Sequence, residues 1–174
     1  MRAALAAEVT VRPQRVHNFG SYFVTTQTWG RRSLFQVDEL ARLFIETLYN
    51  YRSKGNYLLH EFVIMPNHVH LIVTPTGVTL ERTMQLIKGG YSHSLRVNGR
   101  PTLEVWQPGY TDHRIRDEED WAQHVEYIHL NPVRAHLCSS PGEFRYSSAC
   151  GSYELDPIPQ RLKPVAVEGE RRHG

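Results

Sequence analysis

The chain has 174 residues, of which 40% are hydrophobic, as expected of one globular domain with a full core. Its 20 Lys and Arg against 18 Asp and Glu give a net charge of +2, so the totals alone do not indicate a nucleic-acid partner. The sequence shows neither a signal peptide nor an apolar run long enough to cross a bilayer, and we expect a cytoplasmic protein without a membrane partner.

The first half of the chain predicts a strand, a helix and a β-hairpin. Residues 20–29 are rich in β-branched and aromatic side chains, which favours a strand. Residues 37–52 carry apolar side chains at helical spacing. Two further strands, 57–65 and 68–74, flank a Pro-Asn pair and are expected to form an antiparallel hairpin.

The second half predicts two helices around an irregular strand. A helix is expected over 79–97, although the Gly89-Gly90 pair weakens its middle. Residues 103–116 read as a fourth strand that a Pro-Gly pair interrupts. A last helix follows over 117–130, and its acidic first turn complements the positive end of the helix dipole.

The order of these elements predicts the fold class. The pattern β-α-β-β-α-β followed by a helix is typical of an α+β protein with a split βαβ, or ferredoxin-like, antiparallel sheet and helices on one face. We assign residues 1–155 to a single domain and 156–174 to a flexible C-terminal tail, because the tail is rich in proline and lacks periodicity. Cys138 and Cys150 form no CxxC pair and are expected to be free thiols.

Two histidines stand out in the hairpin. His68 and His70 lie one residue apart in an otherwise apolar strand, so both side chains point to the same face while Val69 and Leu71 point to the other. Such a pair can share a divalent ion if a third ligand comes from elsewhere. The alternative is a pair of hydrogen-bonded structural histidines, which is the commoner case for a bare His-x-His. Burial among apolar neighbours favours a partner for both rings.

The last helix carries a second unusual pattern. Tyr127 and Asn131 are four residues apart and therefore share one helix face. Pro132 follows directly and places Asn131 at or near the helix end. A tyrosine for surface packing and an asparagine as a helix cap would give the same pattern.

Together these segments resemble a known family. The stretches "MPNHVHLIVTP" and "YIHLNPVRA", with "YFVTTQTWGRRSLF", "LIKGGYSH" and "VWQPGYTDHRIRDEEDW" around them, are similar to the single-tyrosine HUH transposases (His, hydrophobic residue, His). The closer resemblance is to their REP-associated tyrosine transposase branch, and it covers residues 18–150. This resemblance implies that His68 and His70 are metal ligands, that Tyr127 is the nucleophile, and that Asn131 is a third ligand through its side-chain oxygen.

The implied activity is metal-dependent cleavage and strand transfer of single-stranded, hairpin-containing DNA through a 5′-phosphotyrosine intermediate, with Mg²⁺ or Mn²⁺ as the ion. Two alternatives stay open. One is a domesticated relative that binds DNA hairpins without cleaving them, and the other is an HUH relaxase or replication initiator. Related proteins act as monomers or homodimers, and the tail after Pro157 slightly favours a monomer.

Basic residues outnumber acidic ones in the middle of the chain, which suits a phosphate backbone, although a solvated surface is the more ordinary explanation. We expect DNA contacts from Lys88, Arg96, His113, Arg114 and Arg116. Three large aromatic residues can stack on unpaired bases or serve the core: Trp106, Tyr110 and Trp121. Three other histidines are expected at the helix surface: His124, His129 and His136.

Overall fold

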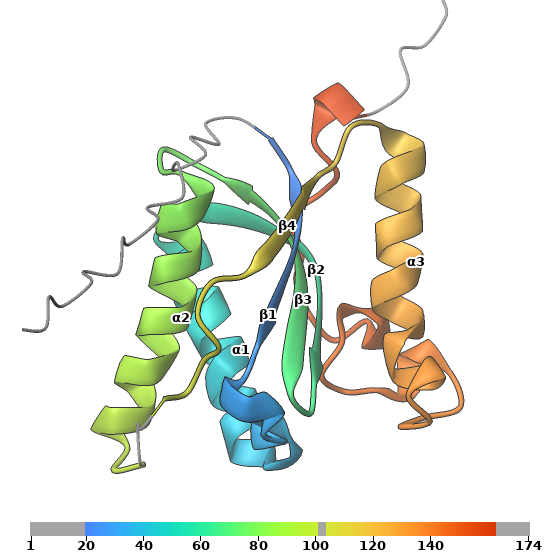
Figure 1. Ribbon diagram of the computed structural model, residues 1–174. Coiled ribbons are helices and arrows are strands. Elements are labelled where there is room, and N and C mark those ends of the chain that lie inside the picture. Colours follow the sequence, from blue (N-terminus) through green and yellow to red (C-terminus); the bar gives the residue numbers. More distant parts are fainter. Residues whose placement is uncertain (1–19, 101–103, 163–174) are drawn as a thin grey trace, which may run out of the picture.

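The computed structural model describes residues 20–100 and 104–162 of the chain. Within them, four strands and three α-helices follow one another in the order β1, α1, β2, β3, α2, β4, α3 (Figure 1). Their bounds are β1 Tyr22–Gln27, α1 Asp38–Ser53, β2 Tyr57–Met65, β3 His68–Pro75, α2 Leu80–Val97, β4 Thr111–Arg114 and α3 Glu118–Arg134. Short 3-10 helices lie in the connections between them.

The strands form one antiparallel sheet in the spatial order β2-β3-β1-β4. This topology is the ferredoxin-like fold, so the predicted fold class is confirmed. At its centre, β1 and β3 pair with Thr25 opposite His70 and Gln27 opposite His68. Residues that face each other in such a pair point to the same side of the sheet, so these four side chains share one face.

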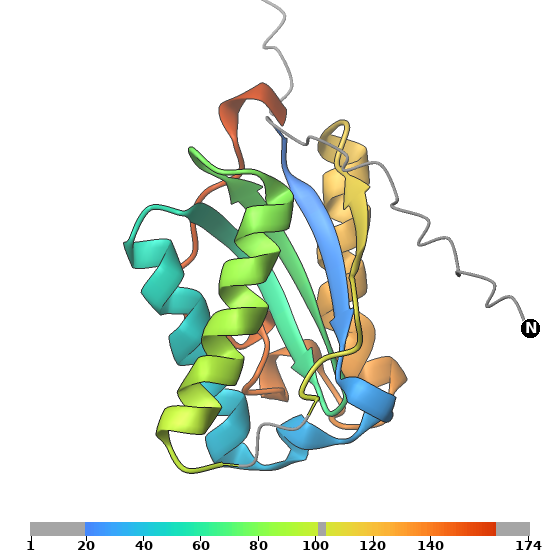
Figure 2. The same ribbon diagram turned by 60° about the vertical axis from the view of Figure 1, so that its left-hand side comes forward.

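The sheet separates two hydrophobic cores (Figures 1 and 2). Helices α1 and α2 cover one face, where β3 contributes Val69, Leu71 and Val73 to the larger core. Of the three α-helices, only α3 lies over the other face. The buried residues of the smaller core there are Val63, Met65, Ile72, Ile115, Ile128 and Leu162. The period-two alternation of β3 therefore sends its histidines to the α3 face.

Helices α1 and α2 pack closely at Gly90. A Cβ atom added at this position would lie 2.3 Å from Cε2 of Tyr51 in α1, whereas a Cβ atom at Gly89 would meet nothing within 4 Å. The second glycine of the pair thus leaves room for the Tyr51 ring, and the first has no such packing role.

The fourth strand is shorter than the predicted range 103–116, of which residue 103 lies outside the described part. Pro108 has no N–H to donate to a neighbouring strand, and Gly109 turns the chain with a φ of 74°. The carbonyls of Gln107 and Gly109 accept hydrogen bonds from Lys88 Nζ at 2.9 and 2.6 Å. The turn residues thus delay regular pairing with β1 until β4 begins.

The last helix runs beyond its predicted end at residue 130. It continues through Pro132 to Arg134, so Asn131 lies inside the final turn and not at the end of the helix. A proline this close to the C-terminus withdraws one N–H, the partner of the Ile128 carbonyl, and the helix tolerates that loss in its last turn.

Residues 156–162, which the sequence assigns to the tail, pack against the body. The Asp156 carboxylate accepts hydrogen bonds from Arg52 Nε at 2.7 Å and Arg52 Nη2 at 3.0 Å. Leu162 is buried in the smaller core beneath α3. The remaining tail, 163–174, lies outside the described residues.

Both cysteines are free thiols, as predicted. Within the described ranges, none of the helices combines the length and the apolar character of a transmembrane span.

Candidate active site

The strand β3 presents His68 and His70 side by side on the face that α3 covers. Their ring centroids are 4.8 Å apart and their planes make an angle of 78°. His70 is only 4% exposed, and His68 at the start of the strand is half-buried. The hairpin that was predicted from sequence therefore holds two imidazoles as close neighbours on a rigid element.

Helix α3 brings Tyr127 to the same rings. Its centroid lies 5.2 Å from that of His70, with an interplanar angle of 77°, and 5.7 Å from that of Phe23 in β1. Phe23 also stacks on His70 at 5.4 Å. Tyr127 nevertheless remains 40% exposed. A phenol thus lies against a buried imidazole and is still accessible from solvent.

The electrostatic environment keeps both imidazoles neutral at pH 7. Burial lowers the pKa of His70 to about 3, and the neighbouring His68 ring acts in the same direction. Burial also lowers the pKa of His68, assisted by the Arg31 guanidinium. Neutral imidazole is the form that binds metals. Nε2 of His70 is buried without a hydrogen-bond partner among the described residues, so the pair fits a divalent cation.

Two histidine–carboxylate contacts fasten α3 to the sheet on either side of Tyr127. At one end, Nε2 of His113 in β4 donates to the Asp120 carboxylate at 2.8 Å. Further along the helix, Nε2 of His129 lies 2.8 Å from the Glu61 carboxylate of β2. His129 is partly exposed on the helix, as expected, and a carboxylate from another element also holds it.

His113, Asp120 and His124 form a second cluster of possible metal ligands, with their donor atoms within 4.8 Å of one another. The rings of His113 and His124 stack with centroids 4.7 Å apart, so the partly exposed His124 also packs against β4. Asp120 also accepts a hydrogen bond from the N–H of Arg116 at 3.0 Å. The positive first turn of α3 and the Arg116 side chain both disfavour a cation here. We assign this cluster to the docking of α3 on β4.

The five residues expected to contact DNA do not form one cluster. Lys88 and Arg96 belong to α2, on the face of the sheet opposite α3, and Lys88 is engaged with the backbone carbonyls before β4. Arg114 and Arg116 line a cavity beyond the end of β4. His113 and Arg116 both contact α3, and each does so by a hydrogen bond to the Asp120 carboxylate.

The other residues singled out from sequence occupy different positions. Asn131 lies one turn beyond Tyr127 on α3 and is partly buried, and its role as a ligand stays a prediction. Trp106 and Tyr110 pack against the larger core and Trp121 against the smaller one. The aromatic side chains thus serve the cores, which is the ordinary role that the sequence also allowed.

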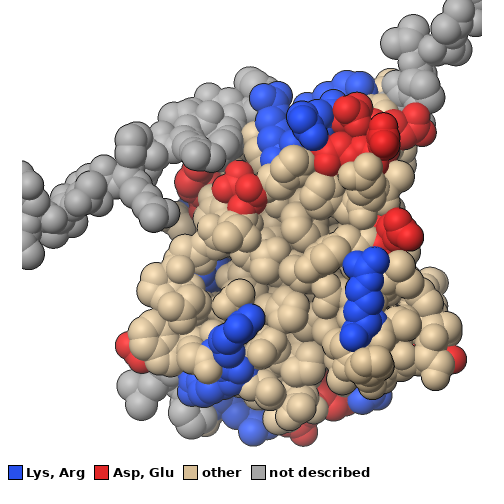
Figure 3. All heavy atoms as spheres, turned by 45° about the vertical axis from the view of Figure 1, so that its right-hand side comes forward, with Lys and Arg blue, Asp and Glu red and all other residues tan. Residues whose placement is uncertain are grey.

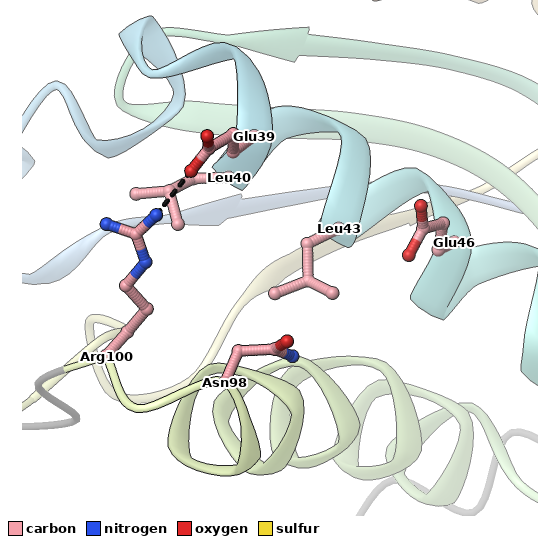
Figure 4. Close-up of a pocket in the computed structure, with 6 residues that line it drawn as sticks. All are labelled: Glu39, Leu40, Leu43, Glu46, Asn98 and Arg100. Carbon is pink, nitrogen blue, oxygen red and sulfur yellow. Dashed lines mark hydrogen bonds and ion pairs between the residues drawn. The ribbon is translucent and has the colours of Figure 1, made fainter.

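Another pocket, of about 240 Å³, lies between α1 and the end of α2 (Figure 4). Its lining residues are Glu39, Leu40, Leu43, Glu46, Asn98 and Arg100. An ion pair between Glu39 and Arg100 crosses one side of it. This pocket is on the far side of the sheet from Tyr127 and contains no group from the candidate active site.

Basic residues lie next to the candidate active site. The guanidinium carbon of Arg134 is 6.0 Å from the ring centre of Tyr127, and Arg31 acts electrostatically on His68. Figure 3 shows Lys and Arg side chains at the top of the face that carries α3, where Asp and Glu side chains lie beside them, and others at mid-height and near the bottom, with uncharged surface between these groups.

Comparison with known proteins places this arrangement in a family. Residues 19–131 match the family model described as "Transposase IS200 like". The match covers more than half of the chain and includes the histidine pair and Tyr127. The chain belongs to the IS200-like transposase family. Membership makes it a transposase-type protein that binds and processes DNA.

Individual relatives point to one branch of this family. A REP-associated tyrosine transposase from Escherichia coli K12 is 25% identical over 144 residues, which cover 79% of this chain and 84% of the relative. An uncharacterized protein from Haemophilus influenzae is 27% identical over 146 residues, which cover 66% of this chain and 81% of that protein. The resemblance to REP-associated tyrosine transposases that the motifs indicate is confirmed.

A solved structure of such a transposase bound to a REP hairpin has the same architecture. The TM-score is 0.62 at 25% identity, and the likeness covers 94% of this chain and 99% of the other. The shared fold therefore includes the sheet, the two helices behind it and the tyrosine-bearing helix in front.

Proposed function

We propose that this protein cleaves and rejoins single-stranded DNA that contains hairpins, with Tyr127 as the nucleophile beside a divalent cation. The observation that carries the proposal is the contact between the rings of Tyr127 and His70, whose centroids are 5.2 Å apart. A nucleophile and a cation must reach one phosphate together, and the contact of the Tyr127 ring with a candidate metal ligand supports this arrangement.

In the forward step, the phenolic oxygen of Tyr127 attacks a phosphorus atom of the DNA backbone. A bond forms between phosphorus and the tyrosine oxygen, while the bond from phosphorus to the 3′ oxygen breaks. The phenol proton passes to solvent, and the departing 3′ oxygen takes up a proton to become a hydroxyl. A second 3′-hydroxyl can attack the phosphotyrosine in the reverse sense, which joins two strands without ATP.

The residues of the site suit this chemistry. A phenol, with a pKa near 10, ionises far more readily than a serine hydroxyl and also leaves more readily in the reverse step. The neutral imidazoles of His68 and His70, with the side-chain oxygen of Asn131, would hold Mg²⁺ or Mn²⁺, and nitrogen ligands favour Mn²⁺. When bound, the ion would polarise a phosphate oxygen and offset the developing charge.

A hairpin-containing DNA partner is supported by the related transposase whose structure contains a REP hairpin. In this chain, Arg134 lies beside Tyr127 and Arg31 acts electrostatically on His68, and both would contact phosphates of the bound strand. The exposed side of the Tyr127 ring would face the incoming strand.

The decisive experiment is a cleavage assay on a single-stranded oligonucleotide with a hairpin, in the presence of Mn²⁺, with a 5′ label to follow the released fragment and a 3′ label to follow the fragment joined to the protein. We expect the parent protein to cleave and to form a covalent protein–DNA adduct. Tyr127→Phe should lose both products while its affinity for the hairpin changes less than about threefold. Tyr49→Phe, on α1 behind the sheet, is the matched control and should cleave like the parent.

Equal hairpin binding without cleavage by either parent or variant would contradict the enzyme and support a non-cleaving hairpin-binding protein. Cleavage by Tyr127→Phe at the parental rate would remove Tyr127 from the reaction.

A further inference from the structure

Each imidazole of the pair has two nitrogen atoms, and only one of them can face a cation. A neutral ring carries its proton on the other nitrogen, so a hydrogen bond at that second nitrogen decides which one is available. The contacts of the two Nδ1 atoms therefore determine which nitrogen could bind the cation of the proposed function. The partners in these contacts are residues that the sequence motifs did not single out.

At His68, the contact is with the preceding residue. Nδ1 lies 2.7 Å from Oδ1 of Asn67. A carboxamide oxygen only accepts hydrogen bonds, so Nδ1 must carry the proton and Nε2 keeps its lone pair. The hairpin turn fixes the position of Asn67, because its backbone carbonyl accepts hydrogen bonds from the N–H and the hydroxyl of Thr28, both at 3.0 Å.

At His70, the contact comes from the neighbouring strand. Nδ1 lies 2.7 Å from Oγ1 of Thr25, which is the residue directly opposite His70 in the β1–β3 register. A hydroxyl can donate or accept, but Nε2 is buried without a partner among the described residues. A proton on Nε2 would be an orphaned donor, whereas a lone pair there can be satisfied by a cation.

We propose that Asn67 and Thr25 are positioning residues, which hold both histidines as Nδ1–H tautomers and thereby direct both Nε2 lone pairs to one cation. The inference rests on the proposed function in one respect, the binding of a cation by the two Nε2 atoms. The tautomers themselves are properties of the protein without metal. The two supports come from different elements, the hairpin turn and β1, so each imidazole is oriented independently.

The first test needs no activity and no substitution in the hydrogen-bond partners. Long-range ¹H–¹⁵N NMR on the full chain, with ¹⁵N-labelled histidine and no metal at pH 7.5, reports which nitrogen carries the proton. Signals are assigned with His68→Gln and His70→Gln. We expect protonated Nδ1 and unprotonated Nε2 in both rings. Protonated Nε2 in either ring would overturn the proposal.

The second test measures Mn²⁺ affinity by titration calorimetry. Asn67→Ala and Thr25→Val should each weaken binding about 10-fold or more, whereas Asn67→Asp and Thr25→Ser, which keep an oxygen at the same place, should recover most of it. The controls Asn98→Ala and Thr76→Val, at exposed positions, should bind like the parent. Unchanged affinity in both Asn67→Ala and Thr25→Val would contradict a positioning role.

Failure of the proposed function would give a different combination of NMR and calorimetry results. A parent protein that shows the expected tautomers but binds no Mn²⁺ would sustain the assignment of the protons and remove the metal centre from the proposed function.

Discussion

At the scale of single residues, the buried and uncharged side chain of His60 makes the free energy of unfolding depend on pH in the acidic range. His60 in β2 is 2% exposed, and burial lowers its pKa below the ordinary 6.5. The unfolded chain therefore binds a proton that the folded chain resists, and stability falls as pH drops below about 6.5. His60→Gln should reduce the slope of unfolding free energy against pH, between pH 6.5 and 5, by up to about 1.4 kcal/mol per pH unit.

Urea unfolding at several pH values, followed by circular dichroism, measures this slope. His93→Gln, at an exposed position on α2, should leave it unchanged. An identical slope for His60→Gln and the parent would show that His60 takes up no extra proton on unfolding.

Single residues also show where sequence reasoning stops. The alternation of β3 was enough to place His68 and His70 on one face, because that property is local. Thr25 and Asp120 could not be found in the same way, since their roles depend on the register between β1 and β3 and on where α3 docks. Both are long-range features that periodicity does not encode.

At the scale of elements, the two adjacent glycines of α2 should respond oppositely to alanine. Gly89→Ala removes the helix penalty of glycine without a clash and should raise the free energy of unfolding by up to about 1 kcal/mol. Gly90→Ala gains the same propensity but drives a methyl group into Tyr51, and overpacking costs about 1–3 kcal/mol. Thermal unfolding of the two variants should therefore give the lower melting temperature for Gly90→Ala.

A third variant separates the two causes. Adding Tyr51→Ala to Gly90→Ala removes the clash, so the penalty specific to position 90 should disappear in this background. Equal stability of Gly89→Ala and Gly90→Ala in the parent background would instead show that the Tyr51 ring moves aside at no cost.

The elements themselves were largely predictable, and their ends were not. The helices and the hairpin follow from strong periodicity, and their order specified the ferredoxin-like topology. The errors fall at Pro108, where a missing N–H and a turn shorten β4, and at Pro132, where a helix tolerates a proline in its last turn. In each case, contacts with the rest of the protein decide where the element begins or ends, and the local sequence does not.

At the scale of the whole molecule, the position of α3 predicts that one chain forms a complete active site. Tyr127 lies against His70 of the same chain, and two histidine–carboxylate contacts hold the helix there. We therefore expect that a mixture of Tyr127→Phe and His70→Gln chains cleaves no more hairpin DNA than either variant alone. The cleavage assay proposed above measures this directly.

Recovery of cleavage in the mixture, toward a quarter or more of the parental rate, would indicate that α3 is exchanged between subunits. Wild-type protein mixed with an equal amount of Tyr127→Phe is the control for dilution of active chains.

The division of the hydrophobic interior by the sheet has a consequence for how such proteins diverge. The larger core between the sheet and the α1–α2 layer contains most of the buried apolar residues, so most of the burial that stabilises the fold lies on the face of the sheet away from Tyr127. Substitutions at exposed positions on the Tyr127 face can accumulate with little loss of foldability. Under the proposed function, the exposed residues that would meet a DNA strand can therefore vary while the scaffold stays the same.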